Sequence, residues 1–163
     1  MTTPVPATPD SGTLTKAGTM ADEQVSVSRT IHASPEDIFE VLAHPNRHQE
    51  IDGSGTVKAS RGDAGERLSR GAKFAMDMKM GVPYRIKNTV VEFEEGRRIA
   101  WRHFGRHIWR YELEPTEGGT LVKETWDISQ ENPASRAMTR RMAGLTRTNM
   151  EKTLARIDEL VGS

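Results

Sequence analysis

The chain has 163 residues, the size of a single domain, and 35% of them are hydrophobic. Its 23 basic and 23 acidic side chains give a formal net charge of zero, so no global charge steers the protein to nucleic acid or to an anionic membrane. The lack of cysteine excludes disulfides, cysteine-ligated metals and a cysteine nucleophile. No secretory signal and no apolar run of about 18 residues is present, and we expect a cytoplasmic protein.

The N-terminal segment differs in composition from the rest of the chain. Residues 1–22 are rich in Thr, Pro, Ser and Gly and show no apolar periodicity. Such a segment cannot bury enough surface to offset its ordering entropy. We therefore predict a disordered tail over 1–22 and a folded domain over 23–163, with Met1 and Met20 both standing as candidate start residues.

A strand and two short helices are expected at the start of the domain. Alternating apolar residues predict a strand over 25–32. Ser34 and Pro35 are typical of the cap and first position of a helix, whose buried side would come from the apolar residues of 38–42. A second short helix is predicted over 45–49.

Six successive strands are predicted next, joined by short glycine-containing turns into an antiparallel meander. The expected strands cover residues 56–60, 72–80, 84–94, 98–103, 107–114 and 120–128. The clearest alternation lies in the second of them. The register of the third is open because Val90 and Val91 are adjacent, which indicates a bulge.

One long helix is predicted from Pro133 to about Val161. Its apolar residues fall into two sets with helical spacing. The sets are Met138, Met142 and Leu145, and then Met150, Leu154, Ile157 and Val161. A step of five residues separates the sets and rotates the apolar stripe, so the helix either covers two different surfaces or bends near Gly144.

These elements predict an α+β fold in which a curved antiparallel sheet wraps around the long C-terminal helix, with two short helices after the first strand. Four segments carry a family resemblance: residues 25–42 (VSVSRTIHASPEDIFEVL), 44–57 (HPNRHQEIDGSGTV), 98–102 (RIAWR) and 111–120 (YELEPTEGGT). They resemble the SRPBCC superfamily of START and birch-pollen-allergen-like domains, in its polyketide cyclase/dehydrase-like branch. The resemblance implies the helix-grip fold, but it does not settle the activity, because the superfamily contains carriers, cyclases, hydroxylase subunits and regulators.

The strands are expected to present aromatic and thioether side chains towards the helix, around a few ionisable groups. The predicted ligand-binding residues are Phe74, Met76, Met78, Trp101, His103, His107, Trp109, Tyr111, Glu124 and Trp126 from the sheet, and Met142 and Leu145 from the helix. Such a mixture is typical of small-molecule pockets, although plain core packing produces the same alternation.

Glu124 is the most informative of these residues. It lies between Val122 and Trp126 in the inward register, where a carboxylate is costly unless it is paired or lies in a wet cavity. A bulge turning it to solvent, or a structural ion pair, would explain it equally well. With His103 and His107 it forms the candidate acid–base set.

Three functions remain open from the sequence. The first is the binding of a hydrophobic or aromatic small molecule, such as a lipid or a polyketide-like compound. The second is a cyclase/dehydrase-type enzyme that uses Glu124 with His103 or His107, and the third is a regulatory or assembly factor that contacts a protein partner through the basic first half of the long helix. No cofactor is expected. No metal is expected either, because His44, His48 and Asp52 form too small a ligand set.

Overall fold

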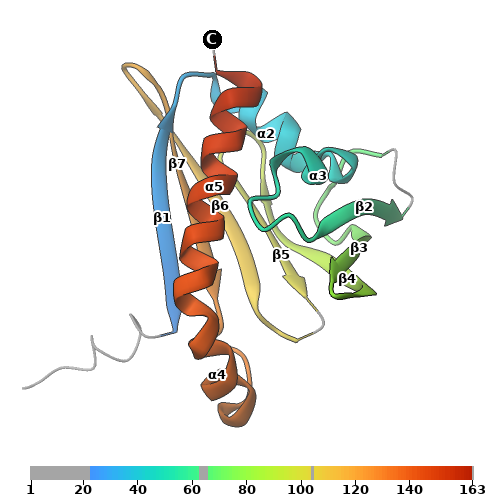
Figure 1. Cartoon of the computed structure of the whole chain (residues 1–163). Coiled ribbons are helices and arrows are strands. Elements are labelled where there is room, and N and C mark those ends of the chain that lie inside the picture. The colour runs from blue at the N-terminus through green and yellow to red at the C-terminus, as the bar shows by residue number, and fades with distance from the viewer. Residues whose placement is uncertain (1–22, 63–65, 104, 163) are drawn as a thin grey trace, which may run out of the picture.

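A seven-stranded antiparallel sheet curves around the C-terminal helix, as Figure 1 shows. The structure is a computed structural model that describes residues 23–62, 66–103 and 105–162. The predicted tail over 1–22 lies outside these residues. The strands are β1 (Gln24–Ile31), β2 (Val57–Gly62), β3 (Lys73–Met80), β4 (Val82–Glu94), β5 (Arg98–His103), β6 (Ile108–Thr116) and β7 (Gly119–Asp127).

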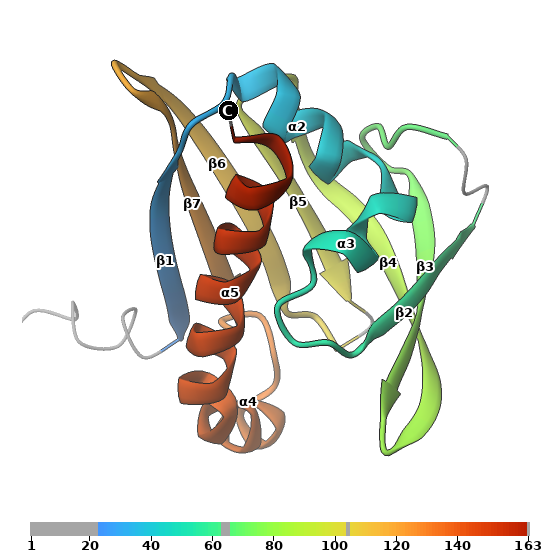
Figure 2. The ribbon, with the colours of Figure 1, turned by 45° about the horizontal axis from the view of Figure 1, so that its top comes forward.

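The sheet order is β1-β7-β6-β5-β4-β3-β2, so the six later strands form a meander and β1 joins it beside β7. The helices are α2 (Pro35–Ala43), α3 (His48–Ile51), α4 (Pro133–Thr139) and α5 (Ala143–Val161), with three-ten turns η1 (Pro45–Arg47) and η2 (Arg140–Met142). Figure 2 shows α2 across the upper end of the sheet and α3 below it, beside α5. The prediction of an α+β helix-grip fold is confirmed.

Two local signals in the sequence have the expected consequences. The Ser34 hydroxyl accepts a hydrogen bond from the Asp37 amide at 3.1 Å and donates one to the Asp37 carboxylate at 2.8 Å, which caps α2. The register of β4 against β5 shifts between Val90 and Glu92. The bulge expected in this strand is therefore present.

The C-terminal helix departs from the prediction of one continuous helix, because η2 interrupts it just before Gly144. The second apolar set packs into the core, with Met150, Leu154 and Ile157 at most 1% exposed. The first set is exposed: Met138, Met142 and Leu145 are 71%, 45% and 60% accessible. The rotated stripe thus separates a packed half of the helix from a half that leaves its apolar side chains at the surface.

Candidate functional site

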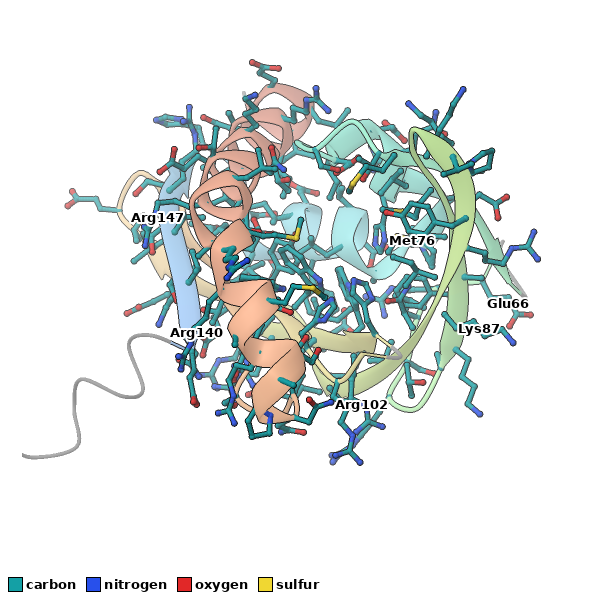
Figure 3. The ribbon with its side chains drawn as sticks, turned by 60° about the horizontal axis from the view of Figure 1, so that its bottom comes forward. Glu66, Met76, Lys87, Arg102, Arg140 and Arg147 are labelled. Carbon is teal, nitrogen blue, oxygen red and sulfur yellow. The ribbon has the colours of Figure 1, made fainter. Side chains whose placement is uncertain are left out.

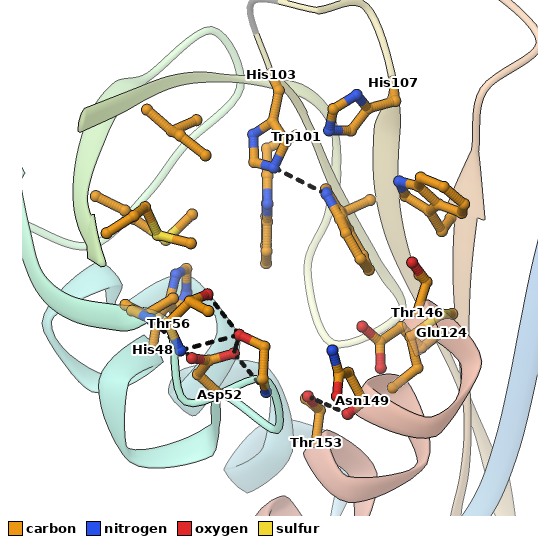
Figure 4. Close-up of a pocket in the computed structure, with 18 of the residues that line it drawn as sticks. His48, Asp52, Thr56, Trp101, His103, His107, Glu124, Thr146, Asn149 and Thr153 are labelled. Atoms are coloured by element: carbon orange, nitrogen blue, oxygen red, sulfur yellow. Dashed lines mark hydrogen bonds between the residues drawn. The ribbon is translucent and has the colours of Figure 1, made fainter. Parts of the chain in front are cut away.

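A cavity of about 370 Å³ lies between the concave face of the sheet and the helical segment from α4 to α5, and the loop after α3 closes one side (Figure 4). The residues from the sheet that line it are Met76, Met78, Met80, Tyr84, Ile86, Trp101, His103, His107, Trp109, Tyr111, Glu124 and Trp126. Those from the α3 region are His48, Ile51, Asp52, Ser54, Thr56 and Val57, and those from the C-terminal helices are Thr139, Met142, Thr146, Asn149, Met150 and Thr153.

Ten of the twelve residues proposed as ligand-binding from the sequence line this cavity. Phe74 does not. It is buried behind the wall, edge-on to the rings of His48 and Trp101 at centroid distances of 5.6 and 5.7 Å. Leu145 does not line the cavity either, because it lies on the solvent-facing side of α5 and is 60% exposed. Whether the other ten contact a ligand stays a prediction.

A row of three tryptophans crosses the sheet at the cavity. Trp101 on β5 is the register partner of Trp109 on β6, which is the partner of Trp126 on β7. The rings of Trp109 and Trp126 are 6.0 Å apart and tilted by 34°. Because neighbouring strands are about 4.8 Å apart, the row spans roughly 10 Å.

His103 has both ring nitrogens engaged with protein. Its Nδ1 pairs with the side-chain oxygen of Asn88, and its Nε2 accepts a hydrogen bond from the indole N–H of Trp109 at 2.9 Å. The proton therefore sits on Nδ1. Burial lowers the pKa of His103 to about 3, helped by the nearby His107. His103 is a neutral structural group that orients Trp109, and it offers no free nitrogen to a ligand.

His107 has a different arrangement. Its Nδ1 lies 3.0 Å from a carboxylate oxygen of Glu131, whose side chain is only 3% exposed. The other oxygen of Glu131 accepts hydrogen bonds from the hydroxyls of Ser135 at 3.2 Å and Thr139 at 2.9 Å. Burial lowers the pKa of His107, while the hydrogen bond to Glu131 acts in the opposite direction. A neutral His107 donates its Nδ1 proton to Glu131, and within the described residues no group pairs with its Nε2.

Glu124 faces inward and is 2% exposed, so no bulge turns it to solvent, and among the described residues it forms no ion pair with a basic side chain. The Tyr111 hydroxyl donates to one carboxyl oxygen at 2.8 Å, while the other oxygen has no hydrogen-bond partner in the described structure. Burial raises the pKa of Glu124 to about 8, although the Tyr111 hydrogen bond lowers it. The group is therefore a neutral carboxylic acid near pH 7, and its neighbour is a phenol rather than an imidazole.

Residues of the α3 region also line the cavity, although the sequence did not predict them there. His48 donates from Nε2 to the Leu42 carbonyl at 2.8 Å and stacks on Trp101 at 5.0 Å. Burial lowers its pKa to about 4, and its Nδ1 is buried without a partner. Next to it, the chain passes so close to α5 that a Cβ on Gly53 would lie 2.1 Å from the Asn149 carbonyl oxygen. Only glycine fits there, and this close approach brings Asp52 to the cavity wall.

Glu131 was missed for a different reason. It belongs to no periodic pattern, and the one available signal was its position directly before the Asn132-Pro133 start of α4.

Among the described residues, no three His, Asp or Glu side chains converge as a metal-binding set. None of the described helices is both long and apolar enough to span a bilayer.

The curved sheet around a C-terminal helix, with a cavity between them, defines a helix-grip protein. The family profile described as polyketide cyclase/dehydrase and lipid transport matches residues 22–162, so the chain belongs to that family. An uncharacterized protein of Mycobacterium tuberculosis, Rv0088, is 34% identical over 144 residues, which cover 83% of this chain and 63% of that protein. The chain thus spans less than two thirds of this relative.

Solved structures share the fold at low sequence identity. A protein from Nitrosomonas europaea superimposes with a TM-score of 0.66 at 18% identity, over 86% of this chain and 94% of its own. The di-domain ARO/CYC StfQ of the steffimycin biosynthetic pathway gives 0.70 at 13% identity, over 88% of this chain and 52% of its own. A Polyketide_cyc-like protein of Corynebacterium glutamicum gives 0.58 at 20% identity, over 84% of this chain and 90% of its own. At these identities the likeness establishes the fold alone.

Proposed function

We propose that the protein binds a flat, largely apolar small molecule in the cavity between the sheet and the C-terminal helix. The observation that carries the proposal is the row of Trp101, Trp109 and Trp126 along a cavity of about 370 Å³. That volume falls within the range of about 300–1,000 Å³ for small-molecule sites. Aromatic faces and methionine thioethers favour a ligand with an extended π surface.

Three buried side-chain atoms of the cavity wall have no hydrogen-bond partner among the described residues. We use them to infer the polar groups of the ligand. The three atoms are the Nε1 of Trp126, a carboxyl oxygen of Glu124 and the Nδ1 of His48, and all three residues line the cavity. A buried polar group that finds no partner is costly, so each favours a ligand or a water that pairs with it. The indole and the neutral carboxylic acid donate, whereas the free nitrogen of His48 accepts.

The length of the tryptophan row limits the size of the ligand. His48 stacks on Trp101 at one end of the tryptophan row, and Trp126 stands at the other end, roughly 10 Å away across two strand spacings. A molecule of two or three fused rings spans this distance. We propose a carbonyl oxygen facing Trp126 or Glu124 and a hydroxyl facing His48.

Native mass spectrometry of freshly purified protein tests the proposal directly. A bound molecule should add discrete mass, and calorimetry should detect a fused-ring phenol or ketone such as 2-naphthol or 9-fluorenone. The Trp126→Phe variant keeps an aromatic ring but removes the N–H, so it should weaken ketone binding by about tenfold, as expected for one buried hydrogen bond. Bare protein mass, together with no heat from any flat aromatic probe, would reject the proposal.

A second function, acid–base catalysis, is favoured by the His107–Glu131 pair. A buried carboxylate that orients a neutral imidazole leaves a basic Nε2 on the other side of the ring, and the Trp126 ring is a neighbour, with ring centroids 6.1 Å apart. This arrangement suits proton abstraction beside a carbonyl group whose oxygen accepts from Trp126. Glu124 is a separate neutral acid in the same cavity.

Deuterium exchange into 2-tetralone in D₂O, followed by NMR, tests this second function. Wild-type protein should accelerate exchange beside the carbonyl, and His107→Gln should lower that rate by about 10²-fold, the scale of a lost general base. Glu131→Gln should lower it less, because the imidazole stays in place. If the wild type does not exceed the buffer rate, the binding function stands without catalysis.

A further inference from the structure

The cavity opens at one end of the molecule, between the β3–β4 hairpin and the helical segment that includes α4, η2 and the start of α5. Four residues line the cavity and are also exposed: Met80 by 57%, Tyr84 by 40%, Met142 by 45%, and Ser54 in the loop after α3. Because a side chain that is both lining and exposed marks an opening, these residues define the mouth. Figure 2 shows the hairpin tip and α4 at the same lower end of the molecule.

Most of the exposed large apolar side chains belong to the two segments that flank this mouth. Seven large hydrophobic side chains are exposed in the described part of the chain, and six of them belong to the hairpin or to the helical segment. These six, which we call the apolar rim, are Met80, Val82, Tyr84, Met138, Met142 and Leu145. The seventh, Leu160, lies near the other end of α5. An apolar cluster from two separate segments at one opening is a feature of interaction sites rather than of scattered surface residues.

Cations accompany the apolar rim although the whole chain is neutral. Arg85 of the hairpin pairs with Asp77, and Arg136 and Arg140 pair with Glu23. Five further exposed basic residues of the hairpin, the end of β5, the β5–β6 turn and η2 form no ion pair with any described residue: Lys79, Lys87, Arg102, Arg106 and Arg141. Three of them, Lys79, Lys87 and Arg102, alternate with cavity-lining residues and therefore lie on the outer face of the sheet. Figure 3 looks towards this end and shows Arg140 on the helical side of the opening and Arg102 and Lys87 on the sheet side.

We propose that the apolar rim and its cations dock the cavity mouth on an anionic lipid surface. Apolar side chains flanked by Arg and Lys insert at the boundary between headgroups and acyl chains, while the cations contact the negatively charged headgroups. The hairpin and the helical segment each carry both exposed apolar side chains and exposed basic ones. A docked mouth would let an apolar molecule move between bilayer and cavity without crossing water, which is unfavourable for it.

The argument for docking uses only the surface, so it is tested separately from ligand binding. Flotation of the full chain with vesicles of neutral phosphatidylcholine, and with vesicles containing about 30% phosphatidylglycerol, should show binding to the anionic vesicles that falls with added salt. The double variant Arg102→Gln/Arg141→Gln should lower this partitioning more than tenfold, since each charge contributes about fivefold. Met138→Ser/Leu145→Ser should lower it as well. None of these four residues lines the cavity.

Matched controls lie at the opposite end of the molecule. Arg97, whose side chain is 72% exposed, and Leu160, which is 39% exposed, offer the substitutions Arg97→Gln and Leu160→Ser, which should leave vesicle binding unchanged. Binding of 2-naphthol by the rim variants should also match the wild type, which separates this inference from the proposed function. No vesicle binding, equal binding to neutral vesicles, or equal losses in the control variants would overturn it. Binding to acidic proteins but not to vesicles would also overturn it, in favour of a protein partner.

Discussion

The two halves of the space between sheet and helix contrast in how they are filled. Towards the C-terminal end, α5 presents Leu154 and Ile157, and α2 presents Ile38 and Leu42, all at most 1% exposed. Towards α4, the helical residues that line the cavity are Thr139, Met142, Thr146, Asn149, Met150 and Thr153. Four of these six side chains are short and polar.

The difference shows where the cavity comes from. The helical segment of α4, η2 and α5 runs along the same curved sheet, but large aliphatic side chains fill the first region, whereas mainly short polar ones leave space in the second. Native interiors are close-packed, so a gap of about 370 Å³ beside three tryptophans reflects the choice of residues on the helix. The packed half supplies stability, and we expect the open half to supply the binding site.

The largest effect is expected in the packed half. Leu154→Ala and Ile157→Ala should each lower the free energy of unfolding by about 2–5 kcal/mol, because each removes a fully buried side chain and leaves a void. Met142→Ala, at the mouth, should change it by less than about 0.5 kcal/mol. Urea unfolding of the three variants measures the contrast, and equal losses would show that the two halves are packed alike.

The next effect concerns pH and the open half. The pKa of Glu124 is raised from 4.5 to about 8, so its contribution to stability is complete below pH 4.5 and is lost as the pH rises towards 8. The buried histidines act in the opposite direction, because the lowered pKa values of His48 and His103 make their contribution complete above about pH 6.5. Between pH 6.5 and 8, Glu124 therefore changes the free energy of unfolding while these two histidines do not.

In that window the wild type should lose up to about 1.4 kcal/mol of stability per pH unit. Glu124→Gln should remove this part of the slope, because an amide does not titrate. Unfolding curves at several pH values provide the measurement, with Glu117→Gln on the exposed β6–β7 turn as the control. An unchanged slope in Glu124→Gln would mean that this carboxyl group is ionised in the folded protein.

A smaller effect is expected at the cap of α4, at the open end of the helical segment. Asn132 caps α4 by accepting a hydrogen bond from the Ser135 amide at 2.9 Å, directly after the Glu131 that holds His107. Asn132→Ala should cost about 1 kcal/mol, similar to Ser34→Ala at the cap of α2. The histidine signals in an NMR spectrum should separate the two variants: Asn132→Ala should shift His107, and Ser34→Ala should leave it in place.

The sequence was sufficient for the fold because its signals were local. Alternating residues predicted the strands, the adjacent Val90 and Val91 indicated the bulge, and the five-residue step in the helix indicated either two covered surfaces or a bend near Gly144, close to the observed interruption by η2. These patterns act over a few residues, and the periods of strands and helices fix which side chains share a face. Ten inward-facing residues could be placed on the cavity for the same reason.

The hydrogen-bond partners could not be predicted in this way. Asn88 and Glu131 are 15 and 24 residues from the histidines that they hold, and neither separation follows from a strand or helix period. Nothing in the sequence distinguished His103 from His107. In the structure both ring nitrogens of His103 have protein partners, whereas the Nε2 of His107 has none among the described residues. The contribution of His48 and Asp52 was also hidden, because it depends on the close approach of Gly53 to α5.

The claim that the open half is a binding site is tested most directly by filling it. Thr146 lines the cavity and is 8% exposed, whereas Thr148, two residues on in α5, is exposed and does not line it. Thr146→Trp and Thr148→Trp therefore place the same large side chain inside and outside the cavity. In calorimetric titrations with 2-naphthol, wild type and Thr148→Trp should bind alike, while Thr146→Trp should bind at least about tenfold more weakly and still unfold cooperatively. Equal binding by all three proteins would contradict the account, because the probe would then occupy some other part of the molecule.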